Sequence, residues 1–429
     1  MIRKAVTLNA KWFLALQSLF YAFANSIEAL VPILLAPILT RTLDPTGYGI
    51  WVLFVTYATF MRPIVGLTTQ DAIRMRFYDF DRAKLDQFTH TALFVMLVLL
   101  TFVSLITVVF GETLAAATKF PQGWLIAIVG AAFLYEVFYT VLALQQFHNR
   151  RKAFLITQVA QASLSMIFII GFLLSGWDWR GVILGRMLSM AIASLWSLHS
   201  LGFTLSSLFR IPERSFYRNI ASFGVVYWPA GAVVMVVATT DKMIAAHYLG
   251  VEASAMFGVA WLFASAFWMV NHSFVLAWTP WLFQKLKISS REGMREVASV
   301  SALYFALAAL AAAAFYFAAM LIAPIMLGEA FHEAIPLLRY AMLAIVMQGY
   351  FIHNMKFLHF DKSIEMMSAC SLLTIAINLS ASTLLLPNFG IAGIMLGTAF
   401  SFGAAFIISG AIIIVRHSNR QKGATSLAG

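Results

Sequence analysis

The sequence predicts an all-α integral membrane protein whose helices form two parallel repeats of about six helices each. The first reason is composition: 61% of the residues are hydrophobic and only 11% are charged, whereas a soluble domain has about 45–50% apolar and about 25% charged residues. The second is that apolar runs of membrane-spanning length recur along the whole chain. The third is that a loop between two such runs occurs twice.

About twelve apolar runs are long enough to cross a bilayer, which takes a helix of about 17–25 residues. They lie near residues 12–40, 50–67, 88–110, 123–146, 154–175, 181–205, 220–246, 255–279, 297–323, 335–357, 364–386 and 391–415. They predict an N-terminal six-helix lobe over 1–210 and a C-terminal six-helix lobe over 211–429. An even number of spans in the first lobe gives both lobes the same orientation, so the repeats are related by an axis along the membrane normal.

The repeated loop indicates a duplicated half. Residues 41–51 follow the first run and residues 247–257 follow the seventh, which sets Leu43 and Leu249 206 positions apart. A second pair of segments, beginning at Gly181 and Gly393, lies 212 positions apart. Duplicated membrane halves are typical of transporters, whose substrate site lies at the interface between the repeats.

The net charge of +11 indicates membrane topology and not nucleic-acid binding. Loops on one side collect most of the lysines and arginines, whereas the opposite loops hold only Arg41, Lys119 and Arg180. By the positive-inside rule the basic side is cytoplasmic. We therefore expect a multi-pass protein of the cytoplasmic membrane with both termini in the cytoplasm.

Several charged residues fall inside the predicted spans, where each costs about 2.5–3.5 kcal/mol at the bilayer centre. They are Glu28, Arg62, Glu136, Arg186, Asp241, Lys242 and Arg339. Lys356 and Glu365 lie near span ends, from which a side chain can reach the interface, and are set aside. Two interpretations are open: the basic residues line a water-filled cavity that receives an anionic group, or the acidic residues of the first lobe neutralise its arginines in interhelical pairs. The excess of cations over anions in the set favours the anion site.

Prolines indicate where helices bend. Pro32 and Pro37 lie in the first span, Pro63 in the second and Pro229 in the seventh. Each removes a backbone donor and kinks or interrupts its helix. The first and seventh spans are equivalent in the two repeats, and both carry proline with an acidic residue. Pro32, Pro37 and Pro229 are therefore candidate hinges of a gate, with irregular but static helices as the alternative.

Other motifs are weak. The sequence Asp79-Phe80-Asp81 matches the D-x-D of metal-dependent sugar-nucleotide enzymes, but a match of this length is common by chance in a charged loop. The histidines are scattered, and the chain has neither an H-E-x-x-H motif nor a phosphate-binding loop. We predict no metal site, no cofactor, no catalytic residue and no built-in ATPase.

Three segments resemble a known family. The first outer loop follows the pattern R-x-L-G-P-x-x-Y-G at Arg41, Leu43, Pro45, Tyr48 and Gly49, although Asp44 replaces the usual glycine. The seventh span ends in the D-[RK] and L-G pattern at Asp241, Lys242, Leu249 and Gly250. The last spans follow L-x-P-x-x-G-I-x-G through Leu385, Pro387, Gly390, Ile391 and Gly393, although Ile394 departs from the Gly-Ala that usually follows. In this order the motifs resemble the Wzx-type O-antigen flippases, bacterial polysaccharide transport proteins of the multidrug/oligosaccharidyl-lipid/polysaccharide (MOP) exporter superfamily.

The resemblance implies a two-lobed, MATE-like bundle around a central cavity that alternates between inward- and outward-facing states. The implied cargo is an oligosaccharide on undecaprenyl pyrophosphate, and the implied partners are the lipid bilayer, a polysaccharide polymerase and chain-length machinery. Because pyrophosphate needs cationic partners and arginine suits forked contacts, the predicted substrate residues are Arg62, Arg186, Lys242 and Arg339, with Arg41 near the outer mouth. Candidates for coupling to an H⁺ or Na⁺ gradient are Glu28, Asp241 and Glu136. Glu28 is favoured over Asp241 because the adjoining Lys242 would oppose protonation of Asp241.

Two other functions are open. A drug or cation exporter of the same superfamily would share the fold but would have a cavity lined by acidic and aromatic residues. A membrane-embedded polysaccharide polymerase or ligase would be an enzyme with a large outer loop carrying catalytic arginine or histidine, and this chain has no such loop.

Overall fold

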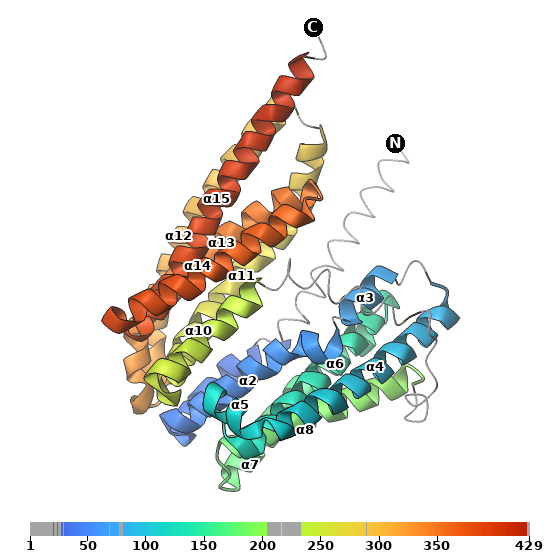
Figure 1. Ribbon diagram of the computed structural model, residues 1–429, viewed down its shortest axis with the longest axis vertical. Helices are drawn as coiled ribbons and strands as arrows, with labels where there is room; N and C mark the ends of the chain where they lie inside the picture. Colours follow the sequence, from blue (N-terminus) through green and yellow to red (C-terminus); the bar gives the residue numbers. More distant parts are fainter. Residues whose placement is uncertain are drawn as a thin grey trace. The chain divides into compact units, whose positions relative to one another are not determined.

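The computed structural model describes residues 20, 24, 27–28, 30–67, 69–76, 80–203, 216, 233–288 and 290–426. Within these residues the chain is helical and has no β-strand (Figure 1), which confirms the predicted all-α fold. The chain divides into two compact units that group segments by packing. The predicted lobes 1–210 and 211–429 stay a prediction.

Unit 1 contains Met1–Thr42, Met61–Val109 and Ile126–Gly224. Its described helices are the short apolar helix Leu30–Thr42, the end of α2 (Pro45–Gly66), α3 (Thr69–Arg76), α4 (Arg82–Val109), α6 (Leu125–Phe147), α7 (Arg151–Leu174) and α8 (Trp179–Ser200). Buried apolar side chains hold α4, α6 and α8 together, among them Phe88, Val141 and Leu198. The side chain of Asp178 caps α8 by accepting a hydrogen bond of 2.9 Å from the backbone N–H of Arg180.

Unit 2 contains Leu43–Phe60, Phe110–Leu125 and Val225–Gly429. Its described helices are the start of α2, α5 (Gly111–Thr118), the 3₁₀ helix η1 (Gln122–Trp124), α10 (Val233–Leu249), α11 (Val251–Ile288), α12 (Arg291–Met326), the 3₁₀ helix η3 (Glu329–Leu337), α13 (Leu338–Phe360), α14 (Ile364–Phe389) and α15 (Ile391–Ser426). Gly250 and Gly390 have positive φ angles of 96° and 56°. This conformation, which glycine adopts at little cost, lets α10 turn into α11 and α14 into α15 without a longer loop.

Ten described helices are long and apolar enough to cross a membrane. They correspond to the predicted spans two to six and eight to twelve, so the chain is a multi-pass membrane protein. The first predicted span is described as a continuous helix only from Leu30, and the seventh only from Val233; the rest of these two spans lies largely outside the described residues. The short helices α3, α5 and η3 were not predicted. Only an apolar run long enough to cross the bilayer gives a clear helix signal in this sequence, and these three helices are shorter than that.

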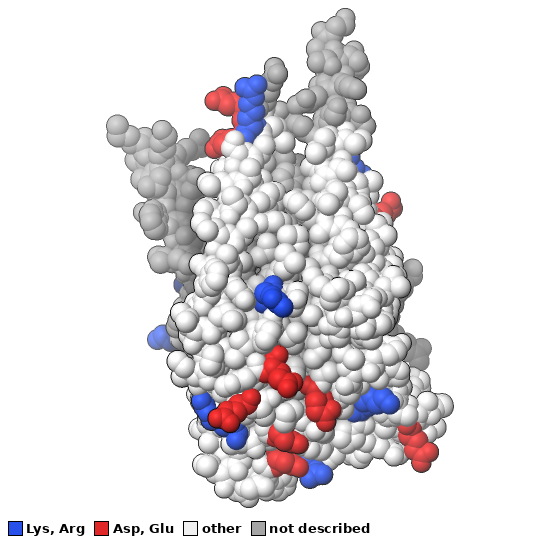
Figure 2. Space-filling model, turned by 90° about the vertical axis from the view of Figure 1, so that its left-hand side faces the viewer, with Lys and Arg blue, Asp and Glu red and all other residues white. Residues whose placement is uncertain are grey.

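The surface of the described helices suits lipid. Large apolar side chains are exposed on α4 (Phe102, Leu105, Val108) and on α12 (Leu310, Phe317, Leu321). Leaving them in water would cost about 25 cal/mol for each Å² of apolar surface, whereas acyl chains remove that cost. On the face in Figure 2, charged side chains gather toward the two ends, and the broad zone between them is largely uncharged.

The two copies of the repeated loop meet within unit 2. Thr46 Oγ1 donates a hydrogen bond of 2.6 Å to Glu252 Oε1, and these residues are 206 positions apart, the offset that relates the two copies in the sequence. Val52 and Gly258 have the same separation, and a Cβ atom added at Gly258 would contact the Val52 side chain. Residues at equivalent positions of a repeat face each other only near the axis that relates the repeats. The start of α2 and the start of α11 therefore pack against each other, as the predicted repeat leads one to expect.

Gly397 on α15 is expected to be indispensable for the packing of α15 on α14. A Cβ atom at this position would lie 2.5–2.7 Å from the Oγ, backbone N and Cα of Ser382, and overpacking of this kind costs about 1–3 kcal/mol. The Gly397→Ala variant should therefore unfold at a lower temperature in a thermal-shift measurement. Gly171→Ala on α7 is the control, because a Cβ there meets nothing within 4 Å; an equal loss from both variants would contradict the packing role.

Candidate functional site

Four of the charged residues predicted inside the membrane come together in unit 1. Arg186 on α8 forms a salt bridge with Glu28, with 2.9 Å between Nη2 and Oε1. Arg62 on α2 forms one with Glu136 on α6, with 3.3 Å between Nη2 and Oε2. The sequence left open whether acidic residues neutralise the arginines in interhelical pairs. The structure contains such pairs and shows which acidic residue is bound to which arginine.

Two tyrosines of α6 join the pairs into one network, here called the paired cluster (Glu28, Arg62, Tyr135, Glu136, Tyr139 and Arg186). The Tyr139 hydroxyl lies 3.1 Å and 3.0 Å from the two carboxylate oxygens of Glu28, to which it can donate, and its ring lies 4.3 Å from the Arg62 guanidinium carbon. The Tyr135 hydroxyl accepts a hydrogen bond of 3.2 Å from Arg186 Nε. Tyr135 and Tyr139 are four residues apart on a helix and so lie on the same face.

The paired cluster is buried and electrically balanced. The side chains of Glu28 and Arg186 are each 12% exposed, and those of Glu136 and Arg62 are 2% and 19% exposed. Removing one member of a buried pair leaves an uncompensated charge, which costs far more than the net value of the pair. Glycine at position 66 makes room for the cluster, because a Cβ there would overlap the Glu136 side chain. Arg62 Nε is buried without a hydrogen-bond partner, so this arginine keeps an unused donor.

A second polar group, here called the Asp241 cluster (Asp241, Asn378, Ser382 and Thr398), lies in unit 2. Asp241 on α10 is fully buried. Its Oδ1 accepts hydrogen bonds from Asn378 Nδ2 at 3.1 Å and Ser382 Oγ at 3.4 Å, and its Oδ2 accepts one from the Thr398 hydroxyl. These partners lie on α14 and α15 and are all neutral. A carboxylate surrounded by neutral hydroxyl and amide groups can hold a hard cation or an exchangeable proton.

The remaining predicted residues lie apart from these clusters. Lys242, next to Asp241 on α10, is half-buried and has no ion-pair or hydrogen-bond partner for its ammonium group among the described residues. Arg339 is exposed at the start of α13, with its guanidinium carbon 4.7 Å from the Tyr340 ring. Arg41 is exposed, and one of its contacts is a hydrogen bond of 3.2 Å to the carbonyl of Pro37. Pro32 and Pro37 lie in the helix Leu30–Thr42, and Pro229 lies outside the described residues.

A model of one protein family, described as "Polysaccharide biosynthesis protein", matches residues 15–286, well over half of the chain. The chain belongs to this polysaccharide biosynthesis family. No curated protein sequence matches it.

The fold of this member of the polysaccharide biosynthesis family is similar to that of several transporters of known structure. A multidrug resistance MATE family transporter of the MOP superfamily, in an inward-facing conformation, superposes with a TM-score of 0.73 at 15% identity, covering 94% of this chain and 99% of that one. An outward-facing structure of such a transporter gives a TM-score of 0.62 at 15% identity, with 94% and 95% covered. A MATE structure in complex with MaL6 gives 0.61 at 16% identity, with 94% and 96% covered. The predicted MOP-type fold is thus confirmed.

Sequence reasoning missed the neutral members of both clusters in this family member. Tyr135 and Tyr139 flank Glu136 in the sequence, and Asn378 and Ser382 lie four residues apart in an apolar span. Polar residues spaced by one helical turn inside such a span lie on one helix face, which is the signal that could have found them.

Proposed function

We propose that the protein is a flippase that moves an oligosaccharide linked to undecaprenyl pyrophosphate across the bacterial cytoplasmic membrane by alternating access. The observation that carries the proposal is membership of a polysaccharide biosynthesis family in a chain that has a MOP transporter fold. The cargo would reach a polymerase and its chain-length machinery on the outer side. In this proposal the basic side of the membrane, with both termini, is the cytoplasm.

The distribution of charge supports an anionic cargo. Arg62 and Arg186 are balanced by carboxylates, whereas Lys242 on α10 has no ion-pair partner among the described residues. A cation held within a membrane helix without a partner is costly and marks a place where an anion is received. In this proposal Lys242 supplies attraction for the pyrophosphate, and Arg62 contributes its unused Nε donor.

We further propose that an ion or proton gradient drives transport through Asp241. Glu28 is fixed in a salt bridge with Arg186. Asp241 accepts its hydrogen bonds from neutral groups, although the charge of the neighbouring Lys242 also acts on it; in this proposal it exchanges a proton or a bound cation more readily than an acid fixed in a salt bridge. This argument reverses the preference for Glu28 that the sequence alone suggested.

A transport assay in vesicles tests whether Asp241 is the coupling residue. With an imposed pH or sodium gradient, Asp241→Asn should abolish the acceleration that the gradient gives to the wild type. The isosteric Asn378→Asp is the matched change in the same cluster, and it should alter the ion dependence without removing it. If Asp241→Asn responds to both gradients as the wild type does, Asp241 is not the coupling residue.

A multidrug exporter is the second candidate, because the similar solved structures include multidrug resistance transporters. The two functions differ in cells that make the polysaccharide. A flippase variant such as Lys242→Gln should cause lipid-linked oligosaccharide to accumulate on the cytoplasmic side while drug resistance is unchanged. Normal polysaccharide export combined with increased drug sensitivity would favour the exporter.

A further inference from the structure

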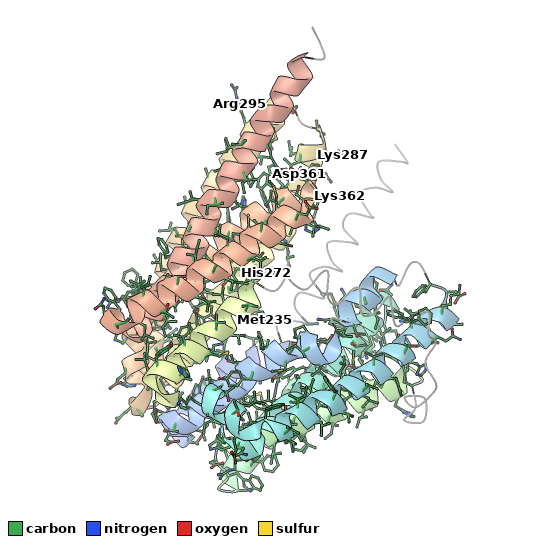
Figure 3. All side chains as sticks on the ribbon, in the orientation of Figure 1. Met235, His272, Lys287, Arg295, Asp361 and Lys362 are labelled. Atoms are coloured by element: carbon green, nitrogen blue, oxygen red, sulfur yellow. The ribbon has the colours of Figure 1, made fainter. Side chains whose placement is uncertain are left out.

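Helix α7 of unit 1 buries a row of neutral polar side chains. Its members are Thr157, Gln158, Gln161 and Ser165, each 1% exposed or less. Charged side chains such as Lys287 and Arg295 lie exposed toward one end of unit 2 (Figure 3), where water can hydrate them. The row on α7 has no such access to the surface, so its hydrogen bonds have to be made inside the protein.

One residue of the row is satisfied by direct contacts with both neighbouring helices. Gln145 Nε2 on α6 donates a hydrogen bond of 3.0 Å to Thr157 Oγ1. The Thr157 hydroxyl also shares a hydrogen bond of 2.8 Å with the Ser197 hydroxyl on α8. These three side chains, here called the polar triad, join α6, α7 and α8 at one level.

Two contacts set the register of α7 against α8. The first is the hydrogen bond between Thr157 and Ser197. The second is a close approach of the backbones, because a Cβ at Gly185 would lie 2.8 Å from the backbone N of Ile169. Residues 157 and 169 are twelve positions apart, as are residues 185 and 197. The two helices are therefore antiparallel, and each turn forward on α7 matches one turn back on α8.

The register places the rest of the row against small residues of α8. Gln161, one turn beyond the polar triad, lies opposite Ala193, and Ser165, one turn further, lies opposite Ser189. Both amide atoms of Gln161 are buried without a hydrogen-bond partner in the part of the chain that the structure describes. The same holds for the hydroxyl groups of Ser165 and of Ser194, which adjoins Ala193. Unpaired donors and acceptors thus gather within about two turns of these helices.

The chemistry of these atoms selects the ligand. Gln161 Nε2 can only donate a hydrogen bond and Gln161 Oε1 can only accept one, whereas a serine hydroxyl does both. A cation would leave Nε2 unsatisfied, and an anion would leave Oε1 unsatisfied. The direct contacts of α7 with α8 on either side of Gln161 leave room for a small ligand only. Water fits, because a buried water molecule makes about three hydrogen bonds to groups that otherwise have no partner.

We propose that unit 1 holds a buried water site between α7 and α8, in which ordered water molecules bridge the Gln161 amide to the hydroxyl groups of Ser165 and Ser194. The site would replace direct contacts between the two helices at this level. It continues toward the paired cluster through Ser189, whose hydroxyl donates a hydrogen bond of 2.8 Å to the carbonyl of Arg186. The bridging water would therefore hold α7 against the helix that carries Arg186.

X-ray radiolytic labelling of the full chain in nanodiscs detects such water, because hydroxyl radicals formed from a bound water molecule oxidise the side chains beside it. Met190 is 1% exposed and lies one turn from Ser194 on α8. It should be oxidised readily in the wild type and much more slowly in Gln161→Leu. Cys370 is the internal control, because it is buried in an apolar cluster of unit 2 and should react slowly in both proteins.

Thermal unfolding gives a second readout. Gln161→Met keeps the length of the side chain and removes both polar atoms. It should lower the unfolding temperature if water satisfies the amide, but raise it if the amide is buried in a dry space, since an unpaired buried amide is costly. Ser165→Ala should lower it less after Gln161→Met than in the wild type, because the two residues share water. The matched control is Gln284→Met, which changes an exposed glutamine near the end of α11 and should have little effect.

Three results would overturn the water site. The first is oxidation of Met190 in the wild type that is no faster than that of Cys370. The second is oxidation of Met190 at the same rate in Gln161→Leu, which would place the water elsewhere. The third is a higher unfolding temperature for Gln161→Met. The first of these measurements needs no variant, so it decides the proposal even if the variants fail to fold.

Discussion

Replacing Arg186 by alanine is expected to destabilise the protein by about 3–5 kcal/mol, because it leaves Glu28 buried without its cation. The salt bridge of 2.9 Å joins side chains that are each only 12% exposed, and Tyr139 would remain as a hydrogen-bond partner of the carboxylate. Thermal unfolding in detergent measures the loss. The double variant Glu28→Gln/Arg186→Gln removes both charges and should recover much of the lost stability.

The matched control is the exposed pair of Arg180 and Asp178, whose side chains are 53% and 45% exposed at the same separation of 2.9 Å. Arg180→Ala should cost less than about 1 kcal/mol, as exposed salt bridges do. Equal effects of the two alanine variants would show that the paired cluster does not stabilise the fold. If Arg186→Ala instead kept its stability but abolished transport, Arg186 would act on the substrate as the sequence suggested.

Joining α2 to α11 by a disulfide is expected to stop transport almost completely. A Cβ at Gly258 would lie 3.3 Å from the Cβ of Val52, slightly closer than the about 3.5–4.5 Å of a disulfide, so Val52→Cys/Gly258→Cys should oxidise readily. These residues occupy equivalent positions of the two predicted repeats. Alternating access by the proposed transporter requires the two repeats to separate at one side of the membrane in one of the two states.

The chain suits this experiment because Cys370 is its only cysteine, and Cys370→Ser gives a background without thiols. Transport should stop on oxidation and return after reduction. As a control, Lys285→Cys/Glu296→Cys can be joined by a short bifunctional linker, because these side chains form an ion pair between the neighbouring helices α11 and α12. Full transport by the oxidised Val52→Cys/Gly258→Cys protein would show that these helices do not separate.

The spans could be predicted from the sequence because the bilayer imposes a length and an apolar character on each of them. The partners of the charged residues could not. Glu28 lies 158 positions from Arg186, and nothing in the sequence distinguishes this pairing from Glu28 with Arg62. The neutral partners of Asp241 could not be predicted for another reason. Asparagine, serine and threonine cost little in a membrane helix, so their presence in a span does not mark a site.

Transport by the purified protein tests the proposed function most directly. Vesicles of phosphatidylcholine would carry a fluorescent oligosaccharide on undecaprenyl pyrophosphate in both leaflets, and a membrane-impermeant reductant would quench whatever reaches the outer leaflet. Without protein about half of the fluorescence should survive. With the wild type almost all of it should be lost, and with Asp241→Asn the loss should be slow. Survival of half of the fluorescence in vesicles that contain folded wild-type protein, with and without ion gradients, would contradict the flippase function.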